Sequence, residues 1–250
     1  VPCGCTGEAA TLSHEEQEQV IEFAIKRVNG QIPVIAGTGS NNTPEAIRLT
    51  KFAKDAGADG ALVITPYYNK PTHEGLVAHY TKVADEADLP IVIYNVPGRT
   101  GRNIEPRTTA ELSKHKNIVA TKEAAGSVDQ VSDVISQCEI VVLSGDDSLT
   151  LPMMAVGGQG VIGVTSNVMP KQAADMVRLF FEGDTNGARA MHYELLPLFK
   201  GLFIETNPMP VKAVLAAMGM IENKLRMPLT PMSSSKWNEL EPIVKKMGLV

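Results

Sequence analysis

Several features are scarce in this chain of 250 residues, and each scarcity excludes a class of protein. Cysteine occurs three times, at Cys3, Cys5 and Cys138, which is typical of a reducing compartment such as the cytoplasm. Cys3 and Cys5 have no second Cys or His pair at ligand spacing, so we expect no metal site. Basic residues form no cluster beyond Lys245-Lys246 and the net charge is −5, which argues against binding to nucleic acid or anionic membranes. No apolar run approaches the roughly 20 residues of a membrane helix.

The chain does have a regular alternation of strand and helix patterns. Short β-branched runs that end in Gly, Pro, Asn or Asp predict strands, and helical periodicity fills the segments between them. Counting a stub at the start, these runs cover residues 1–5, 32–36, 61–65, 91–94, 118–122, 140–143 and 161–165. The repeat of about 25–30 residues matches one βαβ unit. We therefore predict parallel strands joined by crossover helices.

Helix boundaries are marked by local signals. Ser13 with Glu16 forms a capping box before a predicted helix over 14–28, and Thr43-Pro44 opens the next helix. Ser127 with Gln130 predicts another capping box. After residue 183 the strand signals stop, and helices are predicted over 188–203, 210–218 and 236–246. This pattern predicts a barrel region over 1–183 and a helical region over 184–250.

Two sheet architectures fit the alternation. A closed (β/α)8 barrel needs eight strands, and seven are counted here. A doubly wound open sheet is the alternative. No G-x-G-x-x-G follows a predicted strand, so the dinucleotide-binding version of that sheet lacks support.

Lys122 ends the apolar run 118–122 and is the most informative residue of the chain. Desolvation lowers the pKa of a buried lysine, and a neutral amine can attack a ketone to form a Schiff base. The plainer interpretation is a lysine at a strand end that only reaches solvent.

Other strand ends carry polar groups that suit the same chemistry. Tyr67 and Tyr68 follow the run 61–65, Tyr94 ends the run 91–94, and Arg99 follows it. In a parallel barrel such residues face the active site. Phenols move protons, a guanidinium binds a carboxylate, and N–H groups of a Gly loop bind an anion. Together with Lys122 they suit carbon–carbon bond chemistry on a keto acid.

Three motifs in this order carry a family resemblance. They are Gly4-Cys5-Thr6-Gly7-Glu8, Tyr94-Asn95-x-Pro97 and Lys122-Glu123. The chain resembles the pyruvate-dependent class I aldolase family of N-acetylneuraminate lyase and dihydrodipicolinate synthase over essentially its whole length. The segments 65–71 and 96–101 resemble the dihydrodipicolinate synthase branch. The resemblance implies a (β/α)8 barrel with a C-terminal helical region, no cofactor, and a homotetramer built as a dimer of dimers.

The resemblance also implies a role for each matching residue. Lys122 would form the Schiff base with pyruvate, Tyr94 would be the acid/base, and Tyr68 would complete the proton relay in a neighbouring subunit. Thr6 would hold the pyruvate carboxylate and Arg99 the carboxylate of aspartate semialdehyde. The remaining pocket residues would be Cys5, Gly145 and Ile162.

Two departures from the family pattern stand out. Cys5 occupies a position that is usually a second threonine, whose hydroxyl joins the two tyrosines, and a thiol is a weaker donor. The first strand and helix of the family pattern, which precede the Gly loop, have no counterpart. A barrel without them is expected to have an open edge, which a neighbouring chain would have to close.

The implied activity is the condensation of pyruvate with aspartate semialdehyde, at the entry to diaminopimelate and lysine biosynthesis. Another pyruvate-dependent aldolase, such as N-acetylneuraminate lyase, and a non-catalytic barrel stay open as alternatives at this point. Tyr67-Tyr68 and Arg99 favour the synthase. The resemblance further implies feedback inhibition by lysine, at a site formed by Ala9, Ala10, His14, Asn41, Glu45 and Tyr67.

Overall fold

The computed structural model describes residues 1–250, which form two compact units. One unit comprises Val1–Asp146 and Pro152–Ile162, and the other comprises Asp147–Leu151 and Gly163–Val250. Residues 163–183, which the sequence pattern assigned to the barrel region, therefore group with the C-terminal helices. None of the helices is both long and apolar enough to span a membrane.

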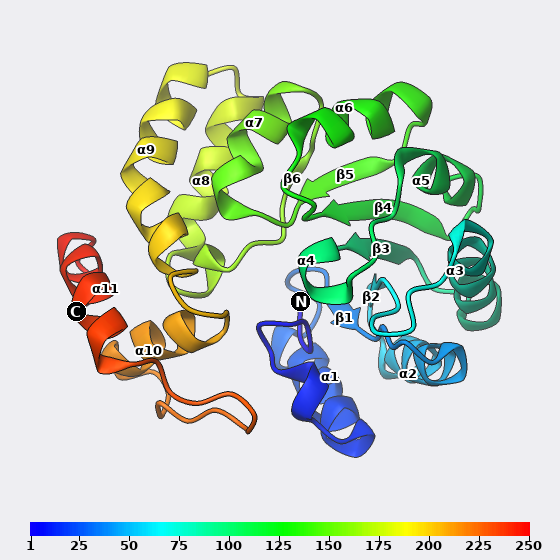
Figure 1. The fold of residues 1–250 in the computed structure, drawn as a ribbon, viewed down its shortest axis with the longest axis horizontal. Helices are drawn as coiled ribbons and strands as arrows, with labels where there is room; N and C mark the ends of the chain where they lie inside the picture. Colours follow the sequence, from blue (N-terminus) through cyan, green and yellow to red (C-terminus); the bar gives the residue numbers. More distant parts are fainter. The chain divides into compact units, whose positions relative to one another are not determined.

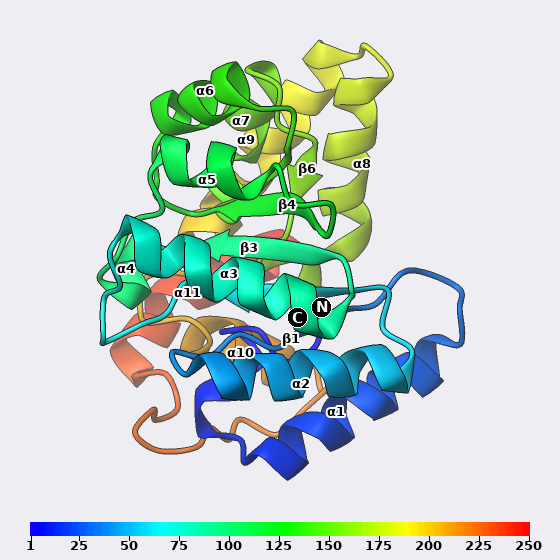
Figure 2. The ribbon, with the colours of Figure 1, turned by 90° about the vertical axis from the view of Figure 1, so that its right-hand side faces the viewer.

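The first unit is built on a parallel sheet of six strands in the sequential order β1-β2-β3-β4-β5-β6 (Figures 1 and 2). The strands are β1 (Ile35–Gly37), β2 (Gly60–Ile64), β3 (Ile91–Asn95), β4 (Ile118–Glu123), β5 (Val141–Ser144) and β6 (Gly160–Val161). A doubly wound sheet reverses its strand order at a switch point. The sequential order excludes that alternative.

Helices join successive strands, as the alternation predicted (Figure 1). They are α2 (Thr43–Ala56) between β1 and β2, α3 (His73–Ala87) between β2 and β3, α4 (Pro97–Thr100) and α5 (Pro106–Leu112) between β3 and β4, and α6 (Val128–Gln137) between β4 and β5. The 3₁₀ helix η1 (Ala9–Thr11) and α1 (His14–Val28) precede β1. Carboxyl ends of parallel strands share one edge of the sheet, so the polar residues that follow them are brought to one side.

One predicted strand segment was wrong, and another was predicted too long. Residues 1–5 form turns, and their backbone meets the sheet through a 2.9 Å hydrogen bond from Gly37 N to Pro2 O. The last strand ends at Val161, because the N–H groups of Val164 and Thr165 bind the Asp147 carboxylate at 2.8 and 3.2 Å. A 3₁₀ turn follows, and six strands form where seven were expected.

The capping signals have different outcomes. The box at Ser13 is confirmed, since Glu16 N donates to Ser13 Oγ at 3.2 Å and Ser13 N donates to Glu16 Oε2 at 2.9 Å. The capping box predicted at Ser127 forms only one of its two hydrogen bonds. The Ser127 hydroxyl accepts from Gln130 N at 3.0 Å, but the Gln130 side chain reaches toward Glu123, a buried carboxylate with hydrogen bonds still to satisfy.

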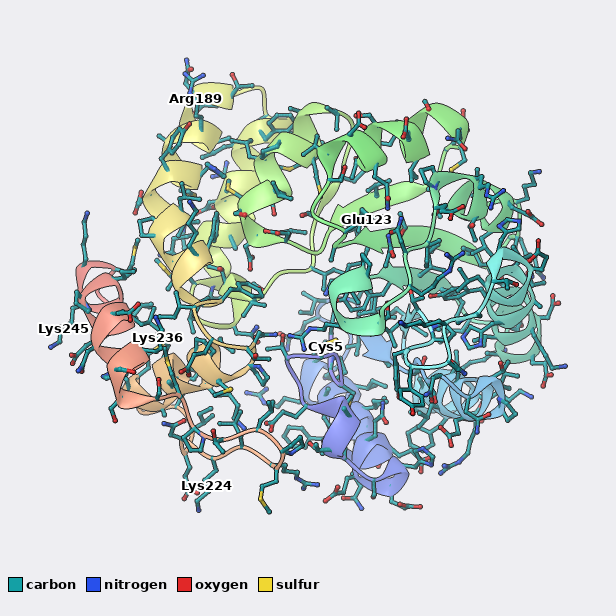
Figure 3. All side chains as sticks on the ribbon, viewed as in Figure 1. Cys5, Glu123, Arg189, Lys224, Lys236 and Lys245 are labelled. Atoms are coloured by element: carbon teal, nitrogen blue, oxygen red, sulfur yellow. The ribbon has the colours of Figure 1, made fainter.

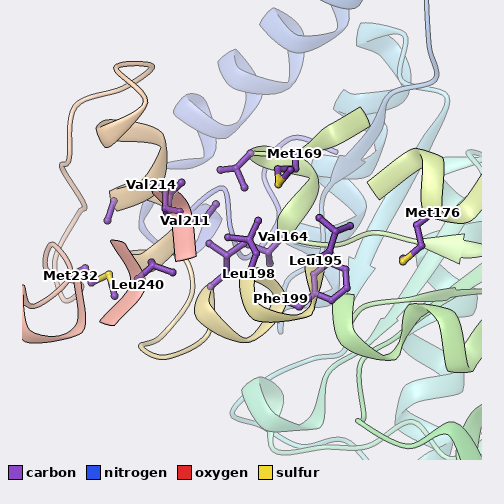
Figure 4. Packing of buried hydrophobic residues seen from close by; sticks show 14 residues of the cluster. Val164, Met169, Met176, Leu195, Leu198, Phe199, Val211, Val214, Met232 and Leu240 are labelled. Atoms are coloured by element: carbon purple, nitrogen blue, oxygen red, sulfur yellow. The ribbon is translucent and has the colours of Figure 1, made fainter. Parts of the chain in front are cut away.

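The second unit is helical and has its own core (Figure 4). Its elements are η2 (Asp147–Leu149), η3 (Thr165–Asn167), α8 (Pro170–Phe181), α9 (Thr185–Gly201), α10 (Met209–Ala217) and α11 (Ser234–Lys246), while α7 (Thr150–Ala155) contributes residues to both units. Leu195, Leu198, Val211, Val214 and Leu240 are all fully buried in one cluster. Each such side chain contributes about 1.5–3 kcal/mol by leaving water.

Candidate active site

The pairing of β3 with β4 brings Tyr94 beside Lys122. The two are register partners, and Lys122 Nζ lies 4.1 Å from the centroid of the Tyr94 ring. A register shift near Ile91 leaves Val119 without a partner, so that Val92 pairs with Ala120 and Tyr94 with Lys122. A slip of one residue would move Lys122 to the opposite face, so this bulge determines which face carries the amine.

Tyr94 is 6% exposed, and its surroundings favour the neutral phenol. Desolvation is the main cause that raises the pKa of Tyr94, the charge and hydrogen bond of Cys5 raise it further, and the positive charge of Arg99 acts in the opposite direction. A phenol that keeps its proton is a donor for a neighbouring substrate oxygen. Cys5 packs against the apolar cluster that contains Tyr94, which agrees with its expected position near the tyrosine.

Gly145 borders Lys122 directly. A Cβ at this position would lie 2.7 Å from the Ala124 Cβ, 3.0 Å from the Lys122 Cε and 3.2 Å from the Glu123 carbonyl oxygen. Only glycine leaves that space open. Gly145 N donates to Glu123 O at 2.7 Å and Ile162 N donates to Ser144 O at 2.9 Å, so both N–H groups are used within the sheet.

The Gly loop lies close against the first strand. A Cβ at Gly37 would be 2.1 Å from Cys3 O, so the backbone of the loop approaches β1 closely. The loop itself is a series of tight turns, with Glu8 N donating to Cys5 O at 3.1 Å. Thr6 is half-buried within these turns.

Arg99 and Tyr68 are exposed. Arg99 sits in α4, directly after the β3 end that carries Tyr94. Tyr68 is 91% exposed and has a left-handed backbone with φ 72°. That conformation is uncommon for a bulky residue and needs support from its surroundings.

The loop around Tyr68 has that support on both sides. Asn41 Nδ2 donates to Tyr67 O at 3.1 Å, and Asn69 Nδ2 donates to Asn41 O at 2.8 Å. The Lys70 side chain packs against Gly101, where a Cβ would lie 2.7 Å from the Lys70 Cε. The loop is anchored while its tyrosine projects into solvent.

The residues expected to bind lysine gather near the start of α1 and α2. His14 Nε2 lies 3.9 Å from Glu45 Oε2, and Ser40 Oγ donates to the same carboxylate at 2.8 Å. The Ser40 hydrogen bond is the main cause that lowers the pKa of Glu45. Asn41 contacts Tyr67, while Ala9 and Ala10 lie in η1 immediately before α1. The structure thus pairs His14 with Glu45 and Asn41 with Tyr67.

One buried carboxylate at the site had no expected role. Glu123 follows Lys122, is 1% exposed and lies near the ends of β3 and β4 (Figure 3). A charged residue that directly follows a strand-end lysine points to the opposite face of the strand. That alternation was the available sequence signal. No group of three or more His, Cys, Asp or Glu side chains is arranged to hold a metal ion.

A lysine amine over a protonated phenol, at the carboxyl edge of a parallel α/β sheet, supplies the groups that a Schiff-base-forming lyase of the class I aldolase type requires. The comparisons with known proteins narrow this class. The model of the dihydrodipicolinate synthetase family matches residues 1–247, and the chain belongs to that family.

Individual relatives agree over the whole chain. The chain is 58% identical to 4-hydroxy-tetrahydrodipicolinate synthase of Syntrophobacter fumaroxidans (strain DSM 10017 / MPOB), over 100% of this chain and 87% of the relative. The crystal structure of dihydrodipicolinate synthase from Aquifex aeolicus is 52% identical with a TM-score of 0.98, covering 99% of this chain and 86% of that one. A lysine-bound structure of the enzyme from Cyanidioschyzon merolae is 38% identical with a TM-score of 0.97, covering 100% and 86%.

Proposed function

We propose that this chain condenses pyruvate with L-aspartate 4-semialdehyde to 4-hydroxy-tetrahydrodipicolinate, in lysine and diaminopimelate biosynthesis. The observation that carries the proposal is the 4.1 Å approach of Lys122 Nζ to the Tyr94 ring in a member of this family. The family's (β/α)8 barrel and a cytoplasmic location are part of the same proposal.

The chemistry begins at the Lys122 amine. Unprotonated Nζ attacks C2 of pyruvate, a C–N bond forms, and the former carbonyl oxygen leaves as water, giving an iminium. Loss of a C3 proton gives an enamine, whose C3 attacks the aldehyde carbon of the second substrate. The amine of that substrate then attacks C2, closes the ring and expels Lys122.

Tyr94 is the proton donor and acceptor for these steps. Its raised pKa keeps the phenol protonated until a substrate oxygen or carbon takes part, and its ring touches the lysine. Thr6 holds the pyruvate carboxylate and Arg99 the carboxylate of the semialdehyde. Gly145 and Ile162 use their N–H groups within the sheet, so they shape the pocket through carbonyl oxygens and, at Gly145, through the missing side chain.

Tyr68 supports a shared active site between two copies of the chain. An anchored loop that projects a phenol into solvent is suited to enter a neighbouring subunit. We infer that Tyr68 completes the proton relay of the partner with Tyr94 and Cys5, within a homotetramer built as a dimer of dimers.

The test of the function is imine trapping. Incubation with pyruvate and borohydride should add a pyruvyl group to Lys122 alone, as mapped by peptide mass spectrometry. Lys122→Arg should remove nearly all turnover of pyruvate plus aspartate semialdehyde, because an always-charged guanidinium does not attack a ketone. An adduct on a different lysine would contradict the assignment. Faster cleavage of N-acetylneuraminate than condensation would instead support the other aldolase activity.

Feedback inhibition by lysine is proposed at the cluster of His14, Asn41, Glu45 and Tyr67. Glu45 is favoured as a carboxylate and would pair with an ammonium group, and a relative's structure contains bound lysine. Titration of lysine at saturating pyruvate should reduce the rate. Glu45→Ala should weaken inhibition, whereas Glu22→Ala, which removes an exposed carboxylate paired with Lys26 on α1, should not. Equal inhibition of both variants would contradict the site.

A further inference from the structure

Glu123 is a buried carboxylate that the proposed reaction does not use. Its Oε1 accepts from Asn95 Nδ2 at 3.0 Å and from Ala125 N at 2.8 Å. Its Oε2 accepts from Gln130 Nε2 at 3.1 Å and from Asn95 Nδ2 at 3.1 Å. Burial raises the pKa of Glu123, and the hydrogen bonds from these partners act in the opposite direction. Each partner is a donor, so the set of hydrogen bonds matches the ionised carboxylate, whereas a carboxylic acid would present its own proton to donors.

The partners of Glu123 come from separate segments of the chain. Asn95 ends β3 and its Oδ1 accepts from Ile104 N at 2.9 Å, while its Nδ2 donates to Asn103 Oδ1 at 2.8 Å. Asn103 Nδ2 also donates to Gln130 Oε1 at 2.8 Å, from the loop after α4 to the first turn of α6. These hydrogen bonds join the ends of β3 and β4, the loop 103–104 and α6.

The joined segments carry the reactive groups. Asn95 directly follows Tyr94 and Glu123 directly follows Lys122, on two strands that pair in register. Because neighbouring residues of a strand face opposite ways, the reactive pair lies on one face and the hydrogen-bonded pair on the other. The loop that follows α4, the helix that contains Arg99, is joined to the same network through Ile104.

We propose that Glu123 is a positioning residue that holds Lys122 over Tyr94 through its buried hydrogen bonds to Asn95, Ala125 and Gln130. This inference rests on the proposed function, since it concerns the lysine that forms the imine. A misplacement of about 1 Å at a reacting group can cost 10²-fold in rate. Glu123 touches no substrate in this account and acts through the geometry of the two strands.

The test uses the whole chain of 250 residues and exchanges the side chains of positions 123 and 130. Glu123→Gln keeps the volume but turns an amide NH₂ toward a donor, and we expect a fall in kcat of roughly ten-fold or more with KM for pyruvate changed little. The rate of borohydride-trapped imine formation should fall in parallel. Glu123→Gln with Gln130→Glu restores donor–acceptor matching between positions 123 and 130, and should recover kcat to within about three-fold of the parent.

Ser127→Ala is the matched control. It removes the cap of α6 in the same turn as Gln130 and leaves the donors to Glu123 in place. It should lower thermal stability with imine formation unchanged. An unchanged kcat in Glu123→Gln, or a folded double variant as slow as the single one, overturns the proposal. A parent protein that forms no pyruvate adduct refutes the proposed function instead, so the two failures are distinct.

Discussion

Replacing Gly145 with alanine places a methyl group against Lys122, the proposed nucleophile. Its Cβ would be 2.7 Å from the Ala124 Cβ, 3.0 Å from the Lys122 Cε and 3.2 Å from Glu123 O. The backbone of Gly145 is not in the left-handed region, so alanine adds steric contacts and no backbone strain. The variant therefore tests the packing around Lys122 alone.

The size of the effect follows from these contacts. Non-bonded carbon atoms prefer about 3.5–4.0 Å, so relief requires shifts of roughly 0.5–1 Å. The end of the Lys122 side chain can rotate, but Ala124 Cβ and Glu123 O are fixed to the backbone that carries the lysine. Overpacking of this kind costs about 1–3 kcal/mol, or roughly 2–12 °C in Tm for a chain of this size. Displacement of the amine should reduce kcat by roughly ten- to hundred-fold.

The assay combines thermal unfolding, steady-state kinetics and borohydride trapping with pyruvate. Gly158→Ala is the control, because its Cβ would lie 2.9 Å from Met153 O, in a comparably tight contact with the backbone that does not involve Lys122. It should lose similar stability and keep kcat. If Gly145→Ala is destabilised but turns over at the parent rate, the argument that Gly145 positions Lys122 is refuted.

Three further outcomes are expected. Arg99→Ala should raise KM for aspartate semialdehyde roughly ten-fold or more, from the loss of a charge-assisted hydrogen bond worth about 1.5–3 kcal/mol, and equal harm to pyruvate binding would contradict this role. Cys5→Thr should leave kcat level or raise it, because a hydroxyl is the stronger donor beside Tyr94, and a large fall would show that the thiol is adapted to this site. Burial lowers the pKa of His79 from 6.5 to about 4, so between these values the unfolded chain binds more protons and stability falls as pH drops. His79 should account for roughly 2 kcal/mol of the fall in the free energy of unfolding between pH 7 and pH 5, and His79→Gln should remove that part of the fall, as measured by urea unfolding. An unaltered pH dependence would contradict the assignment.

Local sequence signals predicted those elements whose boundaries depend on nearby residues. The helices starting at His14 and Thr43 begin where the capping box and the proline place them. The C-terminal helices agree with α9, α10 and α11 to within a few residues. In each case the deciding hydrogen bonds or turn preferences lie within one turn of the boundary.

Features that depend on distant partners were not predictable in this way. The expected strand beyond Val161 is absent because Asp147, from another part of the chain, binds the N–H groups of Val164 and Thr165. The bulge at Val119, which aligns Lys122 with Tyr94, is a property of the pairing between β3 and β4. The sequence identified the polar residues at the strand ends. The distances between them depend on the register in which β3 and β4 pair, which the sequence did not reveal.

The same limit explains why the partners of Glu123 escaped notice. Ala125 is only two residues away, but Asn95 lies 28 residues away and Gln130 lies seven residues away, and Gln130 was expected to serve in a helix cap. The Gln130 side chain could bond either the N-cap backbone of α6 or the buried Glu123 carboxylate. It bonds Glu123, because an unsatisfied buried carboxylate costs more free energy than the loss of one capping hydrogen bond.

The site combines two kinds of residue with different mechanical support. Tyr94 and Lys122 lie on paired strands, and each is followed by a buried residue, Asn95 or Glu123, that fixes the strand end from the opposite face. Tyr68 and Arg99 are exposed and follow the strands in the chain. The bond-forming step requires fixed geometry, whereas exposure suits the roles proposed for Arg99, which is to bind a second substrate, and for Tyr68, which is to reach a neighbouring subunit. Changes at Asn95 and Glu123 should therefore alter the rate of imine formation. Changes at Arg99 should alter binding of the second substrate, and changes at Tyr68 should alter the proton relay in the neighbouring subunit.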